Sequence, residues 1–164
     1  MIERPPSPCI KVCVLVAGDR CAGCWRTLDE IAAWPSMSAE AQWALIGVLE
    51  QRRKNVTEDV VNRIKTHIGS GPAVLFMKGT PDFPQCGFSA QVVSALRASE
   101  AGFHAVNIFE DPELRDALKK FSNWPTYPQL YVNGELVGGC DIVLDLHRSG
   151  ELKKMLADAG ASQA

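Results

Sequence analysis

The stretch Lys78-Gly79-Thr80-Pro81-Asp82-Phe83-Pro84-Gln85-Cys86-Gly87-Phe88-Ser89 decides how this chain folds around its chemistry. It follows the apolar run 73–77, which is typical of a buried strand, and it leads into a helical pattern over 87–99. Cys86 is therefore expected at the end of a strand-to-helix loop. Unpaired backbone N–H groups and the positive end of the helix favour a thiolate there.

Ser89 stands where a Cys-x-x-Cys redox motif would have its second cysteine. A thiol without such a partner can attack a disulfide, but it must then wait for an outside thiol to release it. Cys86 is therefore poorly suited to dithiol exchange and well suited to holding glutathione or a metal.

Working outward from this loop, apolar patterns predict the order αβαβαββα. The expected strands are 73–77, 103–108, 129–132 and 135–137, and the expected helices are 60–68, 87–99, 112–121 and 141–146, after which 151–157 closes the fold. Asn133-Gly134 is the strongest short hairpin signal, and Asp141 is expected to cap its helix. The pattern predicts an α/β fold with a small mixed sheet and helices on both faces.

Composition excludes several classes of protein. The chain has 164 residues with 17 basic and 19 acidic side chains, a formal net charge of −2, and no long basic run, so a nucleic-acid partner is not expected. No apolar stretch approaches a membrane span, and the first residues lack the order of a signal peptide. We therefore expect a cytoplasmic protein without a membrane partner, whose cysteines are metal ligands or reactive thiols before they are disulfides.

Four of the six cysteines lie near the start of the chain, as Cys9, Cys13, Cys21 and Cys24. They offer a full set of soft ligands for zinc or for an iron–sulfur centre, and their spacing does not match the ferredoxin patterns, so the metal stays open. A unit of roughly 50 residues has too little core to be comfortably stable alone, and a metal is one usual remedy. The alternatives are reduced core cysteines and, less favoured, disulfides.

This segment is expected to be a small, mainly helical domain over 1–54, followed by a second domain over 55–164. Thr27-Leu28-Asp29-Glu30 has the spacing of a capping box, and a second helix is expected from Ser38 to about Arg53, running into a linker.

Two further motifs lie near the predicted third and fourth strands. Trp124-Pro125-Thr126-Tyr127-Pro128 precedes a strand, and a proline at that entrance favours a cis peptide that presents the preceding backbone to an extended peptide. Trp124 itself is expected in the core. Gly138-Gly139-Cys140-Asp141 supplies a close-approach turn followed by a carboxylate at a helix start.

From about residue 57 to residue 160, these motifs together resemble a monothiol glutaredoxin of the CGFS type, a thioredoxin-fold protein. The resemblance implies glutathione bound along a groove. It places Lys78 and Arg115 on the glycyl carboxylate, pairs the Thr126-Tyr127 backbone before Pro128 with the middle of the peptide, and puts the γ-glutamyl end at Gly139, Cys140 and Asp141. A tripeptide with two carboxylates and an amine does need such opposite charges at its two ends.

The resemblance also implies a cofactor and partners. A 2Fe-2S cluster needs four ligands, and Cys86 with the glutathione sulfur from each of two subunits would supply them. Proteins similar to this one form such cluster-bridged homodimers, pair with BolA-type proteins and pass the cluster to apoprotein acceptors. The first 50 or so residues resemble a small bacterial domain of unassigned function, often described as a probable iron–sulfur protein.

Three functions follow as hypotheses. The first is an iron–sulfur cluster carrier that is not an enzyme. The second is a glutathione-dependent monothiol oxidoreductase, which needs only Cys86 and free glutathione to reduce mixed disulfides. The third is a regulatory protein that reports iron status to a partner. Cys140 is read first as a small turn residue and second as a thiol that pairs with Cys86 on oxidation.

Overall fold

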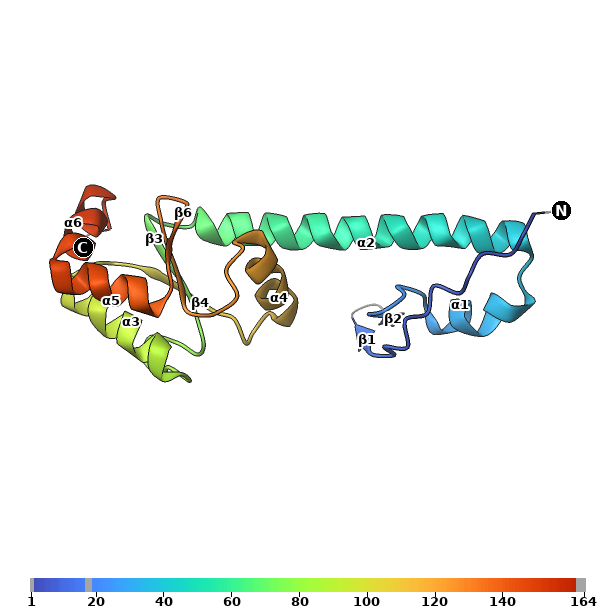
Figure 1. Cartoon of the computed structure of the whole chain (residues 1–164), viewed down its shortest axis with the longest axis horizontal. Coiled ribbons are helices and arrows are strands. Elements are labelled where there is room, and N and C mark those ends of the chain that lie inside the picture. Colours follow the sequence, from blue (N-terminus) through green and yellow to red (C-terminus); the bar gives the residue numbers. More distant parts are fainter. Residues whose placement is uncertain (1, 17–18, 162–164) are drawn as a thin grey trace. The chain divides into compact units, whose positions relative to one another are not determined.

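The structure, a computed structural model, describes residues 2–16 and 19–161. The chain divides into two compact units, Met1–Glu58 and Asp59–Ala164, and helix α2 (Ala39–Ile68) contributes residues to both (Figure 1). Among the described residues, no helix combines the length and the apolar character that crossing a membrane would require.

The N-terminal unit is mainly helical, as predicted. Its elements are the short antiparallel strands β1 (Leu15–Val16) and β2 (Arg20–Cys21), helix α1 (Leu28–Ala33), the 3-10 turn η1 (Trp34–Ser36) and the first part of α2. The predicted capping box is present: the Glu30 N–H donates to Thr27 Oγ1 at 3.2 Å, and the Thr27 N–H donates to Glu30 Oε2 at 2.8 Å. The buried core is small and consists of Trp34, Leu45 and Leu49.

Helix α2 does not end near Arg53 as expected. It continues without a break to Ile68. The helix expected to end near Arg53, the expected linker and the helix expected at 60–68 are therefore one element. The intervening residues 50–59 contain neither glycine nor proline. Two local hydrogen bonds support the helix there, from Gln51 Nε2 to Asn55 Oδ1 and from Thr57 Oγ1 to the Arg53 carbonyl.

The second unit has the predicted mixed sheet. Its strands are β3 (Ala73–Met77), β4 (His104–Asn107), β5 (Gln129–Val132) and β6 (Glu135–Gly138), and its other helices are α3 (Gly87–Ala98), α4 (Pro112–Phe121), α5 (Cys140–Ser149) and α6 (Glu151–Asp158). The strand order is β4-β3-β5-β6; β3 and β4 are parallel, and the other pairs are antiparallel. Asn133 and Gly134 form the hairpin turn with φ of 50° and 84°, as predicted.

Two apolar clusters cover the two faces of this sheet. On one face, Leu75 and Leu130 pack with residues of α3, α5 and α6. On the other, Val74 and Phe76 pack with the end of α2 and with α4. Because both faces are covered, the loops at the end of β3 and before β5 are held on a rigid base.

Candidate functional site

The loop from Lys78 to Cys86 is closed by its own backbone. The Gln85 N–H donates to the Lys78 carbonyl at 2.9 Å, and Thr80 and Phe83 exchange two bonds of 3.2 Å. Gly79 has φ of +86°, and a Cβ there would lie 2.4 Å from the Phe83 carbonyl oxygen, so only glycine fits this turn. The closed loop fixes the start of α3, where Cys86 is the N-cap residue.

Cys86 is half-buried, and its surroundings favour a thiolate. The backbone N–H of Ser89 lowers the pKa of the Cys86 thiol most. Burial opposes this as the next largest effect, and the Phe88 N–H and the Lys78 charge lower the pKa further by smaller amounts. Ser89 is fully buried, and its hydroxyl accepts the Lys78 N–H at 3.2 Å. Where a dithiol would have its second sulfur, the chain therefore has a hydroxyl that holds the loop.

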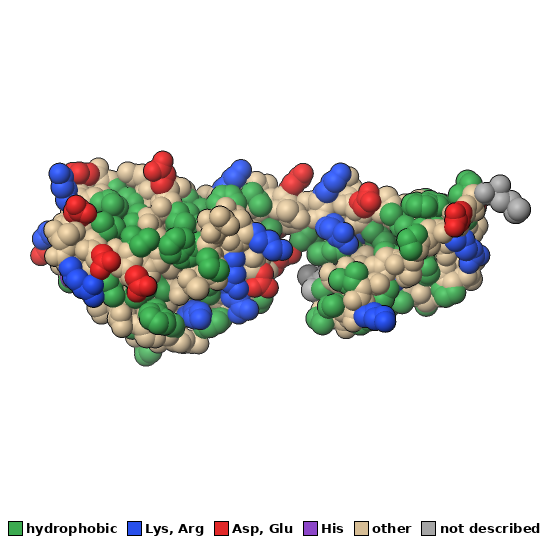
Figure 2. Space-filling view, in the orientation of Figure 1, with side chains coloured by type: hydrophobic (Ala, Val, Ile, Leu, Met, Phe, Trp, Pro, Cys, Tyr) green, Lys and Arg blue, Asp and Glu red, His purple; other side chains and the backbone are tan. Residues whose placement is uncertain are grey.

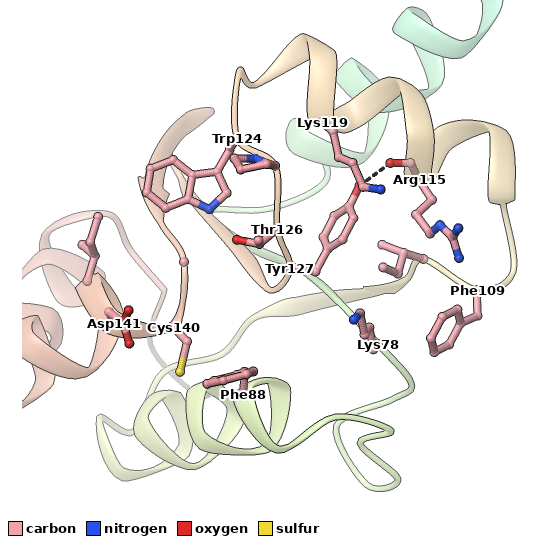
Figure 3. A pocket seen from close by; sticks show the side chains of 14 residues that line it. Lys78, Phe88, Phe109, Arg115, Lys119, Trp124, Thr126, Tyr127, Cys140 and Asp141 are labelled. Atoms are coloured by element: carbon pink, nitrogen blue, oxygen red, sulfur yellow. Dashed lines mark hydrogen bonds between the residues drawn. The ribbon is translucent and has the colours of Figure 1, made fainter.

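A cavity of about 660 Å³ opens beside this loop (Figure 3). It is lined by most of the residues predicted for glutathione: Lys78, Arg115, Thr126, Tyr127, Gly139, Cys140 and Asp141. Pro128 and Cys86 are not among the lining residues, although Phe88, two positions after Cys86, is. The remaining lining residues, which the sequence analysis did not assign to this site, are Ile108, Phe109, Lys119, Trp124, Pro125 and Ile142.

The two sides of the cavity differ in charge. Figure 3 shows Arg115 and Lys119 on one side, Cys140 and Asp141 on the other, and Thr126 between them. Both cations lie near the Asp116 carboxylate, at 3.6 Å from Arg115 Nε and 3.7 Å from Lys119 Nζ. Arg115 Nε is buried and has no hydrogen-bond acceptor within the described part of the chain. The site can therefore hold a carboxylate on the cationic side and an amine on the other.

The segment between the two sides of the cavity, Trp124 to Thr126, is held in place by the side chain of Gln129. Its fully buried amide donates to the Trp124 carbonyl at 3.1 Å and to the Thr126 carbonyl at 3.2 Å. The Tyr127 hydroxyl donates to the Arg115 carbonyl at 2.5 Å, which ties the same segment to α4. The Tyr127–Pro128 peptide is cis, as predicted.

The turn before α5 corrects two expectations. Gly139, not Asp141, is the N-cap residue of α5, and Asp141 lies in the first helical turn. Trp124 was expected in the core, but its half-exposed indole lines the cavity. A Cβ on Gly139 would lie 3.1 Å from Trp124 Nε1, so the glycine lets the indole pack directly on this turn.

Comparison with known proteins agrees with this geometry. The glutaredoxin family model matches residues 73–137. Monothiol glutaredoxin-5, mitochondrial, of Saccharomyces cerevisiae is 49% identical over 114 residues, which cover 68% of this chain and 76% of the yeast protein. Glutaredoxin 4 of Escherichia coli is 48% identical over 101 residues, which cover 62% of this chain and 88% of that protein. The chain belongs to the monothiol glutaredoxins.

Other relatives and structures extend this result. Monothiol glutaredoxin-S11 of Oryza sativa is 52% identical over 111 residues, which are only 23% of its length. The solution structure of reduced poplar apo GrxS14 has a TM-score of 0.57 and 48% identity, covering 65% of this chain and 98% of that chain. A buckwheat glutaredoxin–glutathione complex, at 24% identity and TM-score 0.59, covers 66% of this chain and 97% of that chain and shares the fold. The N-terminal residues 7–53 match a protein family of unknown function, DUF1289.

In this monothiol glutaredoxin, Cys140 is the second thiol of the site. It is buried, and its sulfur lies 3.6 Å from Gln91 Oε1. Burial raises the pKa of the Cys140 thiol, and the nearby charges of Asp141 and Cys86 raise it further. Cys140 is thus the less reactive of the two.

The other four cysteines of this glutaredoxin form two pairs in the N-terminal unit. Cys9 and Cys13 are exposed, whereas Cys21 and Cys24 are buried, and all are free thiols. Within residues 2–16 and 19–161, no three cysteine, histidine or acidic side chains are already gathered as a group that could hold a metal ion.

Proposed function

We propose that this monothiol glutaredoxin carries a 2Fe-2S cluster, held with glutathione between two subunits, and delivers it to apoproteins. The observation that carries the proposal is the combination at Cys86 of a lowered thiol pKa with a buried serine hydroxyl at position 89. Such a thiolate is ready to ligate a metal and has no neighbouring thiol in its motif to displace that ligand.

Glutathione fits the cavity by charge. Its glycyl carboxylate would lie toward Lys78, Arg115 and Lys119, and the orphaned Arg115 Nε would gain an acceptor there. Its γ-glutamyl amine would lie toward Asp141, and the extended backbone at Thr126 and Tyr127 would pair with the middle of the peptide.

The cluster is the cargo of this site. Iron–sulfur clusters take four cysteine-type ligands, and one Cys86 thiolate with one glutathione thiolate from each of two subunits makes that number. The surface around Cys86 is suited to contact with a second subunit, because Phe83 and Phe88 expose 79% and 60% of their areas to solvent. A BolA-type protein is a further partner of this proposal, and the cytoplasm is its compartment.

The test is anaerobic purification of the full chain, followed by reconstitution with iron, sulfide and glutathione. Iron, acid-labile sulfide, glutathione and the visible spectrum are then measured per chain. Cys86→Ser is expected to lose sulfide and glutathione together, and the control Ser94→Ala, at an exposed position of α3 outside the cavity lining, is expected to keep both. Intact protein without sulfide after reconstitution would overturn the carrier function.

The second candidate is glutathione-dependent reduction of protein mixed disulfides, which the lowered pKa of the Cys86 thiol also favours. The Cys86 thiolate would attack the glutathionyl sulfur, release the protein thiolate and form a Cys86–glutathione disulfide. A second glutathione thiolate would then release oxidised glutathione and restore Cys86. Turnover of a glutathionylated peptide by protein that holds no sulfide would put this activity first.

A further inference from the structure

Arg26, in the N-terminal unit, is a buried cation. Only 3% of its surface is exposed, and no carboxylate within the described residues forms a salt bridge with it. Its Nε donates to Cys24 Sγ at 3.3 Å, and its guanidinium carbon lies 5.1 Å from the centroid of a Trp34 ring. Burying an uncompensated charge costs several kcal/mol, which the face of one aromatic ring offsets only in part. A negative charge on the Cys24 sulfur, which accepts the Arg26 Nε–H, would compensate this buried cation.

The segment that links Cys9 to Cys13 contacts the turn that carries Cys21 and Cys24. Cys21 Sγ donates to the Val12 carbonyl at 3.1 Å, and the Ala22 N–H donates to the Val14 carbonyl at 2.8 Å. A Cβ on Gly23 would lie 2.7 Å from the Val12 carbonyl oxygen, so the backbones touch at this point. The segment that links Cys9 to Cys13 is thus packed directly on the Cys21–Cys24 turn.

Backbone N–H groups also order the segments that carry the cysteines. The Cys21 N–H donates to the Arg26 carbonyl at 2.9 Å and the Trp25 N–H donates to the Cys21 carbonyl at 2.7 Å, and these bonds fix the turn that carries Cys21 and Cys24. The Lys11 N–H donates to Cys9 Sγ at 3.4 Å. Donors to sulfur of this kind satisfy thiolates that remain charged after ligation, and they orient the ligands of metal sites.

We propose that Cys9, Cys13, Cys21 and Cys24 form a tetrathiolate metal centre whose negative charge is partly offset by buried Arg26. Four thiolates around one divalent ion leave a net charge of −2, and zinc and ferrous iron share this chemistry. The ion would draw the exposed pair onto the buried pair and complete the set of ligands.

The centre is tested in the full-length Cys86→Ser/Cys140→Ser double variant, so that the glutathione site cannot contribute. Metal-free protein is titrated anaerobically with Co²⁺, whose absorption reports tetrahedral thiolate ligation. We expect one Co²⁺ per chain with sulfur-to-cobalt charge-transfer bands, displaced by Zn²⁺ and abolished in a further Cys24→Ser variant. Protein that binds neither ion, or whose purified form holds two disulfides instead of metal, would overturn the centre and leave the proposed carrier function untouched.

The role of Arg26 is tested by measuring Zn²⁺ affinity in variants that remove or keep its positive charge. Arg26→Met is expected to weaken Zn²⁺ affinity by about 10- to 100-fold, the usual effect of losing an outer-shell partner of a metal site. Arg26→Lys keeps the charge and is expected to restore most of that loss, and Arg53→Met removes an exposed cation of the same unit and is expected to change nothing. Wild-type affinity in Arg26→Met would overturn the counter-cation role. If Arg26→Met fails to fold, the Arg26→Lys variant provides the test. A folded Lys variant that loses about 10- to 100-fold in Zn²⁺ affinity would overturn the counter-cation role.

Bound metal in the purified protein then identifies the ion. Zinc without sulfide or iron without sulfide would each support a single-ion centre. Iron together with sulfide in the double variant would replace it by a cluster on the same cysteines, which overturns the single-ion centre.

Discussion

Cys86 and Cys140 each stand at the beginning of a helix in one site, yet their thiol pKa values move in opposite directions. Cys86 is partly exposed, faces the N–H groups of Ser89 and Phe88 and lies near Lys78. Cys140 is buried and lies beside the Asp141 carboxylate. The comparison teaches that a helix start does not by itself make a reactive thiolate, because burial and one adjacent charge outweigh the helix dipole.

The largest expected effect is the difference in reactivity between these two thiols. At pH 7, iodoacetamide is expected to alkylate Cys86 faster than Cys140 by a factor of about ten or greater, because each unit of pKa changes the thiolate fraction tenfold. Peptide mass spectrometry reads each cysteine separately. The rate at Cys86 is expected to rise with pH to a plateau below the pH at which an ordinary cysteine titrates, and the rate at Cys140 to rise only above it. Equal rates would show that the two thiols do not differ in acidity.

Gln129→Leu tests whether the segment from Trp124 to Thr126 is held by the buried amide of Gln129. The change removes the donors to the Trp124 and Thr126 carbonyls and the acceptor for the Tyr131 hydroxyl. Unsatisfied buried polar groups cost about 1–3 kcal/mol each, so we expect unfolding free energy to fall by at least that amount in urea titrations.

The control for this change is Gln51→Leu, which removes an exposed amide in α2 and is expected to stay within about 0.5 kcal/mol of wild type. Equal stability of the two variants would show that the segment is held by packing alone.

Lys78→Met tests how much the nearby cation contributes to the reactivity of Cys86. Loss of the cation is expected to raise the pKa of the Cys86 thiol and to slow its alkylation at pH 7 about two- to fivefold, since partly exposed charges contribute up to about 1 kcal/mol. The N–H groups of Ser89 and Phe88 remain, so the thiol stays more acidic than an ordinary one. Lys154→Met, an exposed change in α6, is the control, and an equal slowing there would discount a local charge effect.

Asp141→Asn has the smallest expected effect on reactivity. Removing the carboxylate is expected to lower the pKa of the Cys140 thiol and to speed its alkylation by about twofold. The change is small because burial, which comes first among the causes, is untouched. Asp145→Asn in the same helix is the control, and the prediction fails if both variants react at the wild-type rate.

The order of strands and helices in the second unit could be predicted from sequence because its apolar runs are short and end at turn residues. The bounds of β5 and α4 match those expected, and the hairpin follows from Asn133-Gly134. The unbroken α2 was missed because the charged run near Arg53 resembles a helix end. No glycine or proline stops the helix there, and this is the signal that decides.

The cavity was predicted in large part because the family resemblance supplied roles for particular residues. Lys119 was missed, although it lies four positions after Arg115 and therefore on the same helical face. Trp124 could not have been placed from sequence, because an indole beside prolines fits a core and a pocket equally well. The contact of the segment around Val12 with the Cys21–Cys24 turn depends on tertiary packing, which spacing alone does not specify.

The close approach at Gly23 has a consequence for how the N-terminal domain evolves. The glycine is required because a Cβ would meet the Val12 carbonyl oxygen and the Ile10 side chain. Two separate stretches of sequence, around Val12 and around Gly23, are therefore constrained by one contact. In homologues that replace this glycine, we expect the segment from Cys9 to Cys13 to be lost or rebuilt at the same time, so the two changes should be inherited together.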